Sequence, residues 1–435
     1  MSEPAGVLDD IKVLEIASIV AIPVCGLLLA DMGAEVIKVE PRAGEPFRVT
    51  SGPIFPGESK GYTLFNRGKR AFCLDLSHPR AAEVVDRLVA ASDVVLVSLK
   101  LSDVPRYGLE YERLSEVRPG LVYLEHAPLG PEGPNADDGG YDVVVQGRSG
   151  VAAITGRSLG PAPAWVRPAY NDMATGFLSA LAVVAALRHR DRTGEGQKVT
   201  TSLLSTAVAL GGPMLHWFAA TDPPVWERLE EDLARLRADG AGFESQRSLL
   251  FDRLQPGARH NIYFRHYRTA DGFISVGCLS PALFARFRAV TGVDDPRSRP
   301  GWDPEAGGAG AELDAMVARA EALLAEHSSA WWLGRLREGG VPSGPFNFPH
   351  EAFRDPQINA NDYLPEIEHP VLGTYRSFAT PFRMAKTPPR IRKSSPLYDA
   401  DTDAILAEAG FSPDEVAALR SEGVVGGSGP QEQVW

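Results

Sequence analysis

The sequence lacks most of the short motifs that identify enzymes. Cysteine is scarce: Cys25, Cys73 and Cys278 are the only three in 435 residues, so neither a disulfide framework nor a cysteine zinc site is expected. The nine histidines form no H-E-x-x-H motif, and there is no Walker loop and no G-x-S-x-G motif. We therefore expect no bound metal, and nucleophilic serine chemistry is not indicated.

Positive charge is also in short supply. Lys and Arg number 44 against 56 Asp and Glu, which gives a net charge of −12 and argues against nucleic acid or an anionic membrane as partner. The longest apolar run, Leu178–Leu187, is shorter than a membrane span, and the acidic start Met1–Asp10 is unlike a signal peptide. The sequence thus predicts a cytoplasmic, multidomain globular protein with reduced cysteines.

Short β-branched runs alternate with helical stretches over the first 200 residues. This alternation predicts a doubly wound α/β domain with a parallel sheet. The expected strands are Ile11–Ala17, Ala34–Glu40, Ala71–Leu76, Asp93–Leu99, Leu121–His126 and Lys198–Leu203. The turn after the first strand, Ala17–Pro23, contains no glycine, so a dinucleotide fingerprint is absent and NAD or FAD is not expected.

The middle of the chain differs in composition. Residues 222–256 are charged and helical in pattern, and Tyr267–Leu279 predicts a β-hairpin that turns at Asp271-Gly272. We predict a large domain from residues 1–221, a linker and small α/β domain over 222–345, and a return segment, 346–435, that completes the large domain.

One acid stands out by its position. Asp172 directly precedes a long apolar helix, and an acid at such a place is usually an N-cap that accepts backbone N–H bonds. The positive pole of the helix also suits an ionised carboxylate in a partly dry pocket, where it could act as a covalent nucleophile. The two interpretations of Asp172 are compatible.

Several longer segments together resemble the class III CoA-transferases, the family of formyl-CoA transferase, carnitine CoA-transferase and α-methylacyl-CoA racemase. The similar segments read LADMGAEVIKVEP, FNRGKRAFCLDLSHP, RYGLEYERLSEVRPGLVYLEHAPLGPEGP, DMATG, ALRHRDRTGEGQ and GVPSGPFN. The resemblance runs from about Leu8 to Val425. It implies a Rossmann-like large domain, a smaller α/β domain and an interlocked homodimer.

The resemblance also implies a mechanism. Asp172 stands where the transferases have their nucleophilic aspartate, which forms a mixed anhydride with the donor acyl group and then an aspartyl-CoA thioester. An acyl-CoA and a small carboxylic acid would be the substrates, and no permanently bound cofactor is implied. Contacts with CoA fall, by the same resemblance, on Val20, Ala21, Arg42, Leu74, Ser98, Lys100, Arg106 and Tyr141.

Departures from the family pattern bear on the reaction. Racemases have a histidine where this chain has Tyr141, and a tyrosine is a poor base for removing an α-proton, so transfer is favoured over racemisation. Formyl-CoA transferase has a glutamine at the position of Val20 and a tetraglycine loop; neither is present, so a larger, less polar acceptor than oxalate is expected. A racemase or isomerase using Asp172 as a base, and an inactive CoA-binding protein, remain the alternatives.

Overall fold

A computed structural model describes residues 6–52, 54–55, 58–160, 162–255 and 257–429. The chain divides into two compact units, one formed by Met1–His216 with Asn361–Trp435 and the other by Trp217–Ala360. The domain limits predicted from the sequence, 1–221, 222–345 and 346–435, stay a prediction. The first five residues, to which the expectation about a signal peptide applies, lie outside the described residues.

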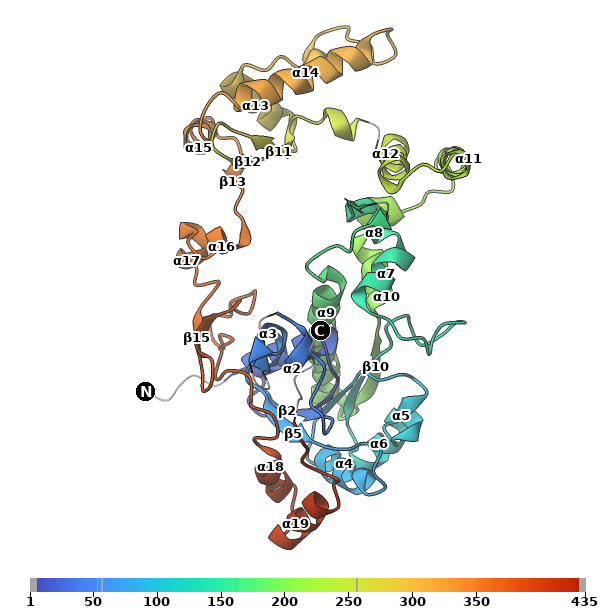
Figure 1. Ribbon diagram of the computed structural model, residues 1–435, viewed down its shortest axis with the longest axis vertical. Helices are drawn as coiled ribbons and strands as arrows, with labels where there is room; N and C mark the ends of the chain where they lie inside the picture. Colours follow the sequence, from blue (N-terminus) through green and yellow to red (C-terminus); the bar gives the residue numbers. More distant parts are fainter. Residues whose placement is uncertain (1–5, 53, 56–57, 161, 256, 430–435) are drawn as a thin grey trace. The chain divides into compact units, whose positions relative to one another are not determined.

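A six-stranded parallel sheet forms the centre of the first unit (Figure 1). Its strands are β1 (Lys12–Ile16), β2 (Glu35–Glu40), β5 (Arg70–Cys73), β6 (Val94–Val97), β7 (Val122–His126) and β10 (Gln197–Thr201). All six strands predicted from the sequence are therefore present. Their spatial order is β10-β7-β6-β1-β2-β5, the order of a doubly wound nucleotide-binding fold.

This order places a topological switch between β1 and β6. The chain winds from β1 outward to β5 and then returns to the other side of β1 to form β6. Parallel sheets with such a switch bind ligands outside the carboxyl ends of the two strands, where the connecting loops diverge. The segments that follow Ile16 and Val97 are therefore the first place to look for a site.

Helices cover both faces of the sheet. On one face α1 (Ala21–Asp31) and α9 (Tyr170–Thr193) share a core with Val13 and Leu96. On the other, Leu14 and Val95 pack with α4 (Ala81–Ala90), α6 (Tyr111–Val117) and the C-terminal α18 (Thr402–Glu408) and α19 (Pro413–Ser421). Alternate residues of one strand thus point to opposite faces, and the sheet is buried on both sides.

The end of the chain joins the edge of this sheet. Leu74, just beyond β5, pairs with Val425 in an antiparallel bridge, and the Asp75 N–H donates to the Val424 carbonyl over 2.9 Å. The remaining elements of this unit are α2 (Phe47–Thr50), β3 (Ile54–Phe55), β4 (Glu58–Ser59), α3 (Lys60–Asn66), α5 (Asp103–Arg106), α7 (Asp142–Ser149), α8 (Val151–Thr155), β8 (Ser158–Leu159), β9 (Ala162–Pro163), α10 (Leu203–Leu210), β14 (Glu366–His369) and β15 (Gly373–Arg376).

The second unit has its own core around Phe287, Trp332 and Leu336. Its antiparallel sheet is formed by β11 (Phe264–Arg268), β12 (Phe273–Gly277) and β13 (Ser343–Pro345), and β11 and β12 make the hairpin predicted around Asp271-Gly272. Its helices are α11 (Pro223–Ala238), α12 (Phe243–Leu254), α13 (Pro281–Thr291), α14 (Ala309–Leu324), α15 (Ser329–Glu338), α16 (Pro349–Ala352) and α17 (Pro356–Ala360).

Among the described residues, α9 is the one helix long and apolar enough to cross a membrane by length and composition. The whole helix is longer than the apolar run Leu178–Leu187 considered in the sequence. It packs along α1, and its Ala180, Val183, Ala186 and Leu187 belong to the core. A buried core helix passes the same test, so α9 is weak evidence for a membrane span.

Candidate active site

Two neighbouring cavities open at the switch point of the sheet. One, of about 240 Å³, lies at Asp172, and the other, of about 370 Å³, lies over the ends of β1, β2 and β5. Both are lined by Ser18, Ser98 and Leu99, which follow β1 and β6 directly. We call them the Asp172 cavity and the β2 cavity.

Asp172 is the third residue of α9. The N-cap position is held by Ala169, which makes no side-chain cap, so the expectation that Asp172 is the N-cap was wrong. The helix begins at Tyr170, three residues before the start that an N-cap at Asp172 implies, and the carboxyl group is left to line the Asp172 cavity. Burial and then the charge of Asp142 raise the pKa of Asp172 to about 7, despite the favourable helix pole.

Asp142 is a buried second acid that the sequence did not single out as a site residue. It is the first residue of α7, and Gln146 donates a hydrogen bond to its Oδ2. Its Oδ1 is buried without a hydrogen-bond partner. Gln146 also bonds both backbone groups of Val166, at 3.0 and 3.1 Å, and so holds the segment leading to α9 beside Asp142.

Helices α1 and α9 approach each other closely one turn after Asp172. A Cβ at Gly176 would lie 2.6 Å from the carbonyl oxygen of Ala21 and 2.6 Å from the side chain of Val24. Any larger residue would push the two helices apart. Gly176 therefore sets the distance between the helix of Asp172 and the loop that ends at Val20, directly before α1.

That loop is held in an unfavourable conformation. Ile19 has φ +75°, which is costly for a β-branched residue and persists only where the surroundings enforce it. Lys38 Nζ donates to the carbonyl of Ala17 over 2.9 Å, before the loop, and Lys69 Nζ donates to the carbonyl of Pro23 over 2.9 Å, after it. The two lysines thus fix both ends of the loop.

These lysines belong to a fully buried ionic cluster. Glu15 pairs with Lys38 at 3.2 Å and with Lys69 at 2.8 Å, and Lys38 also pairs with Glu45 at 2.8 Å. All four side chains are at most 1% exposed. A buried cluster of this kind contributes orientation rather than much net stability, because desolvation offsets the attraction.

The structure gathers most of the predicted site residues but not all. The Asp172 cavity is lined by Val20, Ala21, Ser98, Lys100, Tyr141 and Asp172, and the β2 cavity by Arg42, Leu74 and Ser98. Lys100 is exposed and forms no ion pair with any described residue. Arg42 Nε donates to the carbonyl of Gly426 over 3.0 Å, which orients its side chain from the returning C-terminal segment.

Arg106 lines neither cavity. Its side chain is 65% exposed, pairs with Asp103 at 3.5 Å and lies 5.3 Å from the ring of Tyr107. Tyr107 itself lines the β2 cavity. Arg106 is thus next to that cavity and directed toward solvent and its own helix.

His126 is another residue of the Asp172 cavity that the sequence did not mark. It ends β7, is 3% exposed, and lies 3.2 Å from Thr201 through Nδ1. Burial lowers the pKa of His126 to about 4, so the imidazole is neutral. The feature of the sequence that could have pointed to His126 as a site residue is its place at the carboxyl end of a predicted strand.

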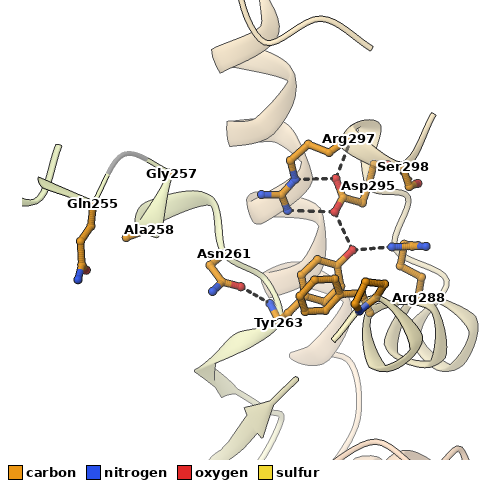
Figure 2. Close-up of a pocket in the computed structure, with 11 residues that line it drawn as sticks. Gln255, Gly257, Ala258, Asn261, Tyr263, Arg288, Asp295, Arg297 and Ser298 are labelled. Carbon is orange, nitrogen blue, oxygen red and sulfur yellow. Dashed lines mark hydrogen bonds and ion pairs between the residues drawn. The ribbon is translucent and has the colours of Figure 1, made fainter. Parts of the chain in front are cut away.

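The second unit contains a separate cavity of about 680 Å³ (Figure 2). Its polar groups already pair with one another: Arg297 holds Asp295 at 2.9 and 3.0 Å, Tyr263 OH donates to Asp295 over 2.6 Å, and Arg288 donates to Tyr263 OH over 2.9 Å. None of the predicted site residues lines it. The described residues also contain no group of three or more His, Cys, Asp or Glu able to hold a metal.

Comparison with known proteins identifies the family. The family model described as CoA-transferase family III matches residues 8–237 and 243–402. The chain belongs to CoA-transferase family III. The family and enzyme class predicted from the sequence are thereby confirmed.

Curated members of the family resemble this chain over nearly its whole length. It is 32% identical to succinate–glutarate CoA-transferase of Agrobacterium fabrum, over 92% of this chain and 95% of the relative. It is 30% identical to succinyl-CoA:mesaconate CoA-transferase of Haloarcula marismortui, over 93% and 97%. Among solved structures, a CaiB/BaiF family protein from Brucella suis has a TM-score of 0.71 at 27% identity, covering 93% of this chain and 100% of that one.

Proposed function

We propose that this family III CoA-transferase moves CoA from an acyl-CoA to a carboxylic acid through covalent intermediates on Asp172. The observation that carries the proposal is the position of the Asp172 carboxyl, in a cavity at the switch point that also holds Val20, Ala21, Ser98, Lys100 and Tyr141. The site has a carboxylate nucleophile, and the exposed cation of Lys100, which forms no ion pair with any described residue, suits a polyanionic ligand.

The reaction begins with attack by a carboxylate oxygen of Asp172 on the thioester carbon of the donor. The C–S bond breaks, CoA leaves as the thiolate, and a mixed anhydride remains on Asp172. The thiolate then attacks the aspartyl carbon and expels the donor acid, which leaves an aspartyl-CoA thioester. The acceptor carboxylate repeats these steps in reverse, so Asp172 and the acceptor-CoA thioester are released.

CoA would extend from the Asp172 cavity into the β2 cavity. The two share Ser18, Ser98 and Leu99, so a ligand can pass from one to the other along the carboxyl ends of β1 and β6. Arg42 and Leu74 would then contact the nucleotide part. Arg106, being exposed, would need only a change of rotamer to reach a phosphate.

Short dicarboxylic acids are the proposed acyl groups. The relatives named above act, by their names, on succinate, glutarate, succinyl-CoA and mesaconate. A volume of about 240 Å³ at Asp172 has room for a short acid beside the thioester. The purified protein, given a panel of acyl-CoAs and acids, should form new thioesters detectable by mass spectrometry, with longer dicarboxylates such as succinate and glutarate favoured over oxalate and long-chain acids.

Trapping tests the covalent step. Treatment with donor acyl-CoA followed by hydroxylamine or borohydride should modify Asp172, and Asp172→Ala should abolish transfer while CoA still binds. Asp191→Asn, which changes an exposed acid near the end of the same helix, is the matched control and should keep full activity. Transfer that survives in Asp172→Ala rules out the mechanism.

A racemase or isomerase is the second candidate. A carboxyl group whose pKa is about 7 is suited to act as a base at neutral pH, which favours this alternative, whereas the tyrosine at position 141 argues against it. Deuterium entering the α-carbon of an acyl-CoA without any acceptor acid would support the racemase. An inactive CoA-binding protein would instead bind CoA in calorimetry and turn over no thioester.

The quaternary state is part of the proposal. We infer an interlocked homodimer in the cytoplasm, without nucleic acid, membrane or a resident cofactor. In support, Phe177, Leu178 and Leu181 of α9 are 37%, 47% and 65% exposed, an apolar face that a second copy would cover. A monomeric mass in dilute native solution would contradict the dimer.

A further inference from the structure

The cavity of about 680 Å³ in the second unit has a volume typical of sites for small organic ligands. None of its lining residues lines the Asp172 cavity or the β2 cavity. Its charged lining residues are Arg288 from α13, Asp295 and Arg297 (Figure 2). With two guanidinium groups and one carboxylate, the lining has a net positive charge, although the chain as a whole is acidic.

One of the two guanidinium groups is neutralised within the cavity wall. Arg297 Nε and Nη2 donate to the two carboxylate oxygens of Asp295 over 2.9 and 3.0 Å, which makes a bidentate ion pair. Burial by itself would raise the pKa of Asp295, but the hydrogen bonds from Arg297 and Tyr263 lower it, so the carboxylate is ionised. Asp295 and Arg297 therefore balance each other's charge.

Arg288 has no such partner. Its Nη1 donates to the hydroxyl of Tyr263 over 2.9 Å, and the side chain forms no ion pair with any described residue. The Tyr263 hydroxyl in turn donates to Asp295 over 2.6 Å. Burial, and then the hydrogen bond to Asp295, raise the pKa of Tyr263 to about 12, so the phenol is uncharged at neutral pH. The positive charge of Arg288 is thus held in one orientation and is not neutralised.

Polar and apolar groups near Arg288 suit an anion that has an apolar part. Asn261 accepts the Tyr263 N–H through Oδ1 over 2.9 Å, and its Nδ2 forms no hydrogen bond with any described residue. Phe284 stacks on Tyr263 with ring centroids 4.2 Å apart, and it lines the cavity together with Pro281. A planar guanidinium matches two oxygens of a carboxylate or a phosphate, and the aromatic rings offer an apolar surface beside it.

We propose that the cavity of the second unit binds a small organic anion, a carboxylate or a phosphate ester, whose charged end pairs with Arg288 and whose apolar part packs on Phe284. Such a ligand would neutralise the charge of the cavity wall that has no partner among the described residues. The lining shares no residue with the Asp172 cavity, so binding there does not require the proposed transferase chemistry. Charge-assisted hydrogen bonds of this kind correspond to about tenfold to a hundredfold in affinity.

Four probes separate the contribution of the charge from that of the apolar contact. Phenylacetate and phenyl phosphate carry a ring and an oxyanion, benzyl alcohol carries the ring alone, and acetate carries the oxyanion alone. In calorimetry with the full wild-type chain, we expect phenylacetate or phenyl phosphate to bind at least about tenfold more tightly than benzyl alcohol and acetate. The tighter of the two ring-bearing anions shows whether the ligand is a carboxylate or a phosphate ester.

Variants locate the bound anion. Arg288→Gln should weaken binding of the tighter probe by about tenfold to a hundredfold, and Arg288→Lys, which keeps the charge without the planar fork, should weaken it by a smaller factor. Arg337→Gln removes the same charge from an exposed position on α15 that lines none of these three cavities, so it should leave the affinity unchanged. Melting curves report whether each variant is folded.

Two kinds of result would overturn this assignment. If neither ring-bearing anion binds the wild type, or if benzyl alcohol binds as tightly, the cavity does not select an organic anion. If Arg288→Gln and Arg337→Gln both bind the probe as the wild type does, the anion binds elsewhere on the chain. Should Arg288→Gln fail to fold, wild-type affinity in Arg288→Lys would likewise overturn the pairing with the guanidinium group.

Discussion

Replacing Asp172 with asparagine should make the protein more stable at alkaline pH. The pKa of Asp172 rises from its ordinary 3.8 to about 7 on folding, chiefly because the carboxyl is buried. A raised pKa means that the folded state binds this proton more tightly than the unfolded chain does. The stabilising contribution of protonated Asp172 is complete below pH 3.8 and is lost as the pH rises through about 7.

The size of the stability gain follows from the interval between the two pKa values of Asp172, 3.8 in the unfolded chain and about 7 in the folded protein. At about 1.36 kcal/mol per pH unit, the span from 3.8 to about 7 corresponds to an upper limit of about 4 kcal/mol. Because the carboxyl faces a cavity that water can enter, we expect about half of this limit, or about 2 kcal/mol. Asparagine has nearly the same shape as aspartate and no charge. The free energy of unfolding of Asp172→Asn should therefore exceed that of the wild type by about 2 kcal/mol above pH 8 and by less than half of this at pH 5.

Urea unfolding of the wild type, Asp172→Asn and Asp191→Asn at pH 5.0, 7.0 and 8.5 measures the gain. Asp191 is exposed on the same helix, so its variant should show no comparable rise with pH. The reasoning is refuted if the difference between Asp172→Asn and the wild type is the same at pH 5.0 and 8.5, or if the variant is less stable at 8.5.

Three further predictions concern the surroundings of Asp172. The kcat/KM of the wild type should rise with pH through about 7 as Asp172 ionises. Asp142→Asn should move that rise to lower pH, because it removes a negative charge near Asp172. A pH profile that does not move would contradict the influence of Asp142 on the pKa of Asp172. Lys38→Met should cost about 3 to 5 kcal/mol in urea unfolding, because the buried carboxylates of Glu15 and Glu45 each lose an ion-pair partner. Lys12→Met, in an exposed pair, should cost under about 0.5 kcal/mol. Gly176→Ala should lower both the melting temperature and kcat, since the new methyl group meets the backbone of α1; wild-type values would show that α1 and α9 can separate freely.

Local patterns were enough for much of the fold. Short runs typical of strands alternate with helical stretches, so all six strands of the parallel sheet could be placed from the sequence, including β5, which has no β-branched residue. Asp172 could be found for the same reason, since it stands at the start of the most apolar stretch of the sequence. Its N-cap assignment failed because a helix can begin a turn earlier than its apolar pattern does.

The sequence by itself therefore determined the strands, the choice of Asp172 and the family, because each depends on neighbouring residues or on the order of long motifs. Only the tertiary structure decided which distant groups meet. Asp142 raises the pKa of Asp172 from another helix, Thr201 contacts His126 from the neighbouring strand, and Lys38 holds a loop that begins twenty residues before it. Charge and hydrogen bonding act over a few ångströms in space, and the sequence does not record those distances.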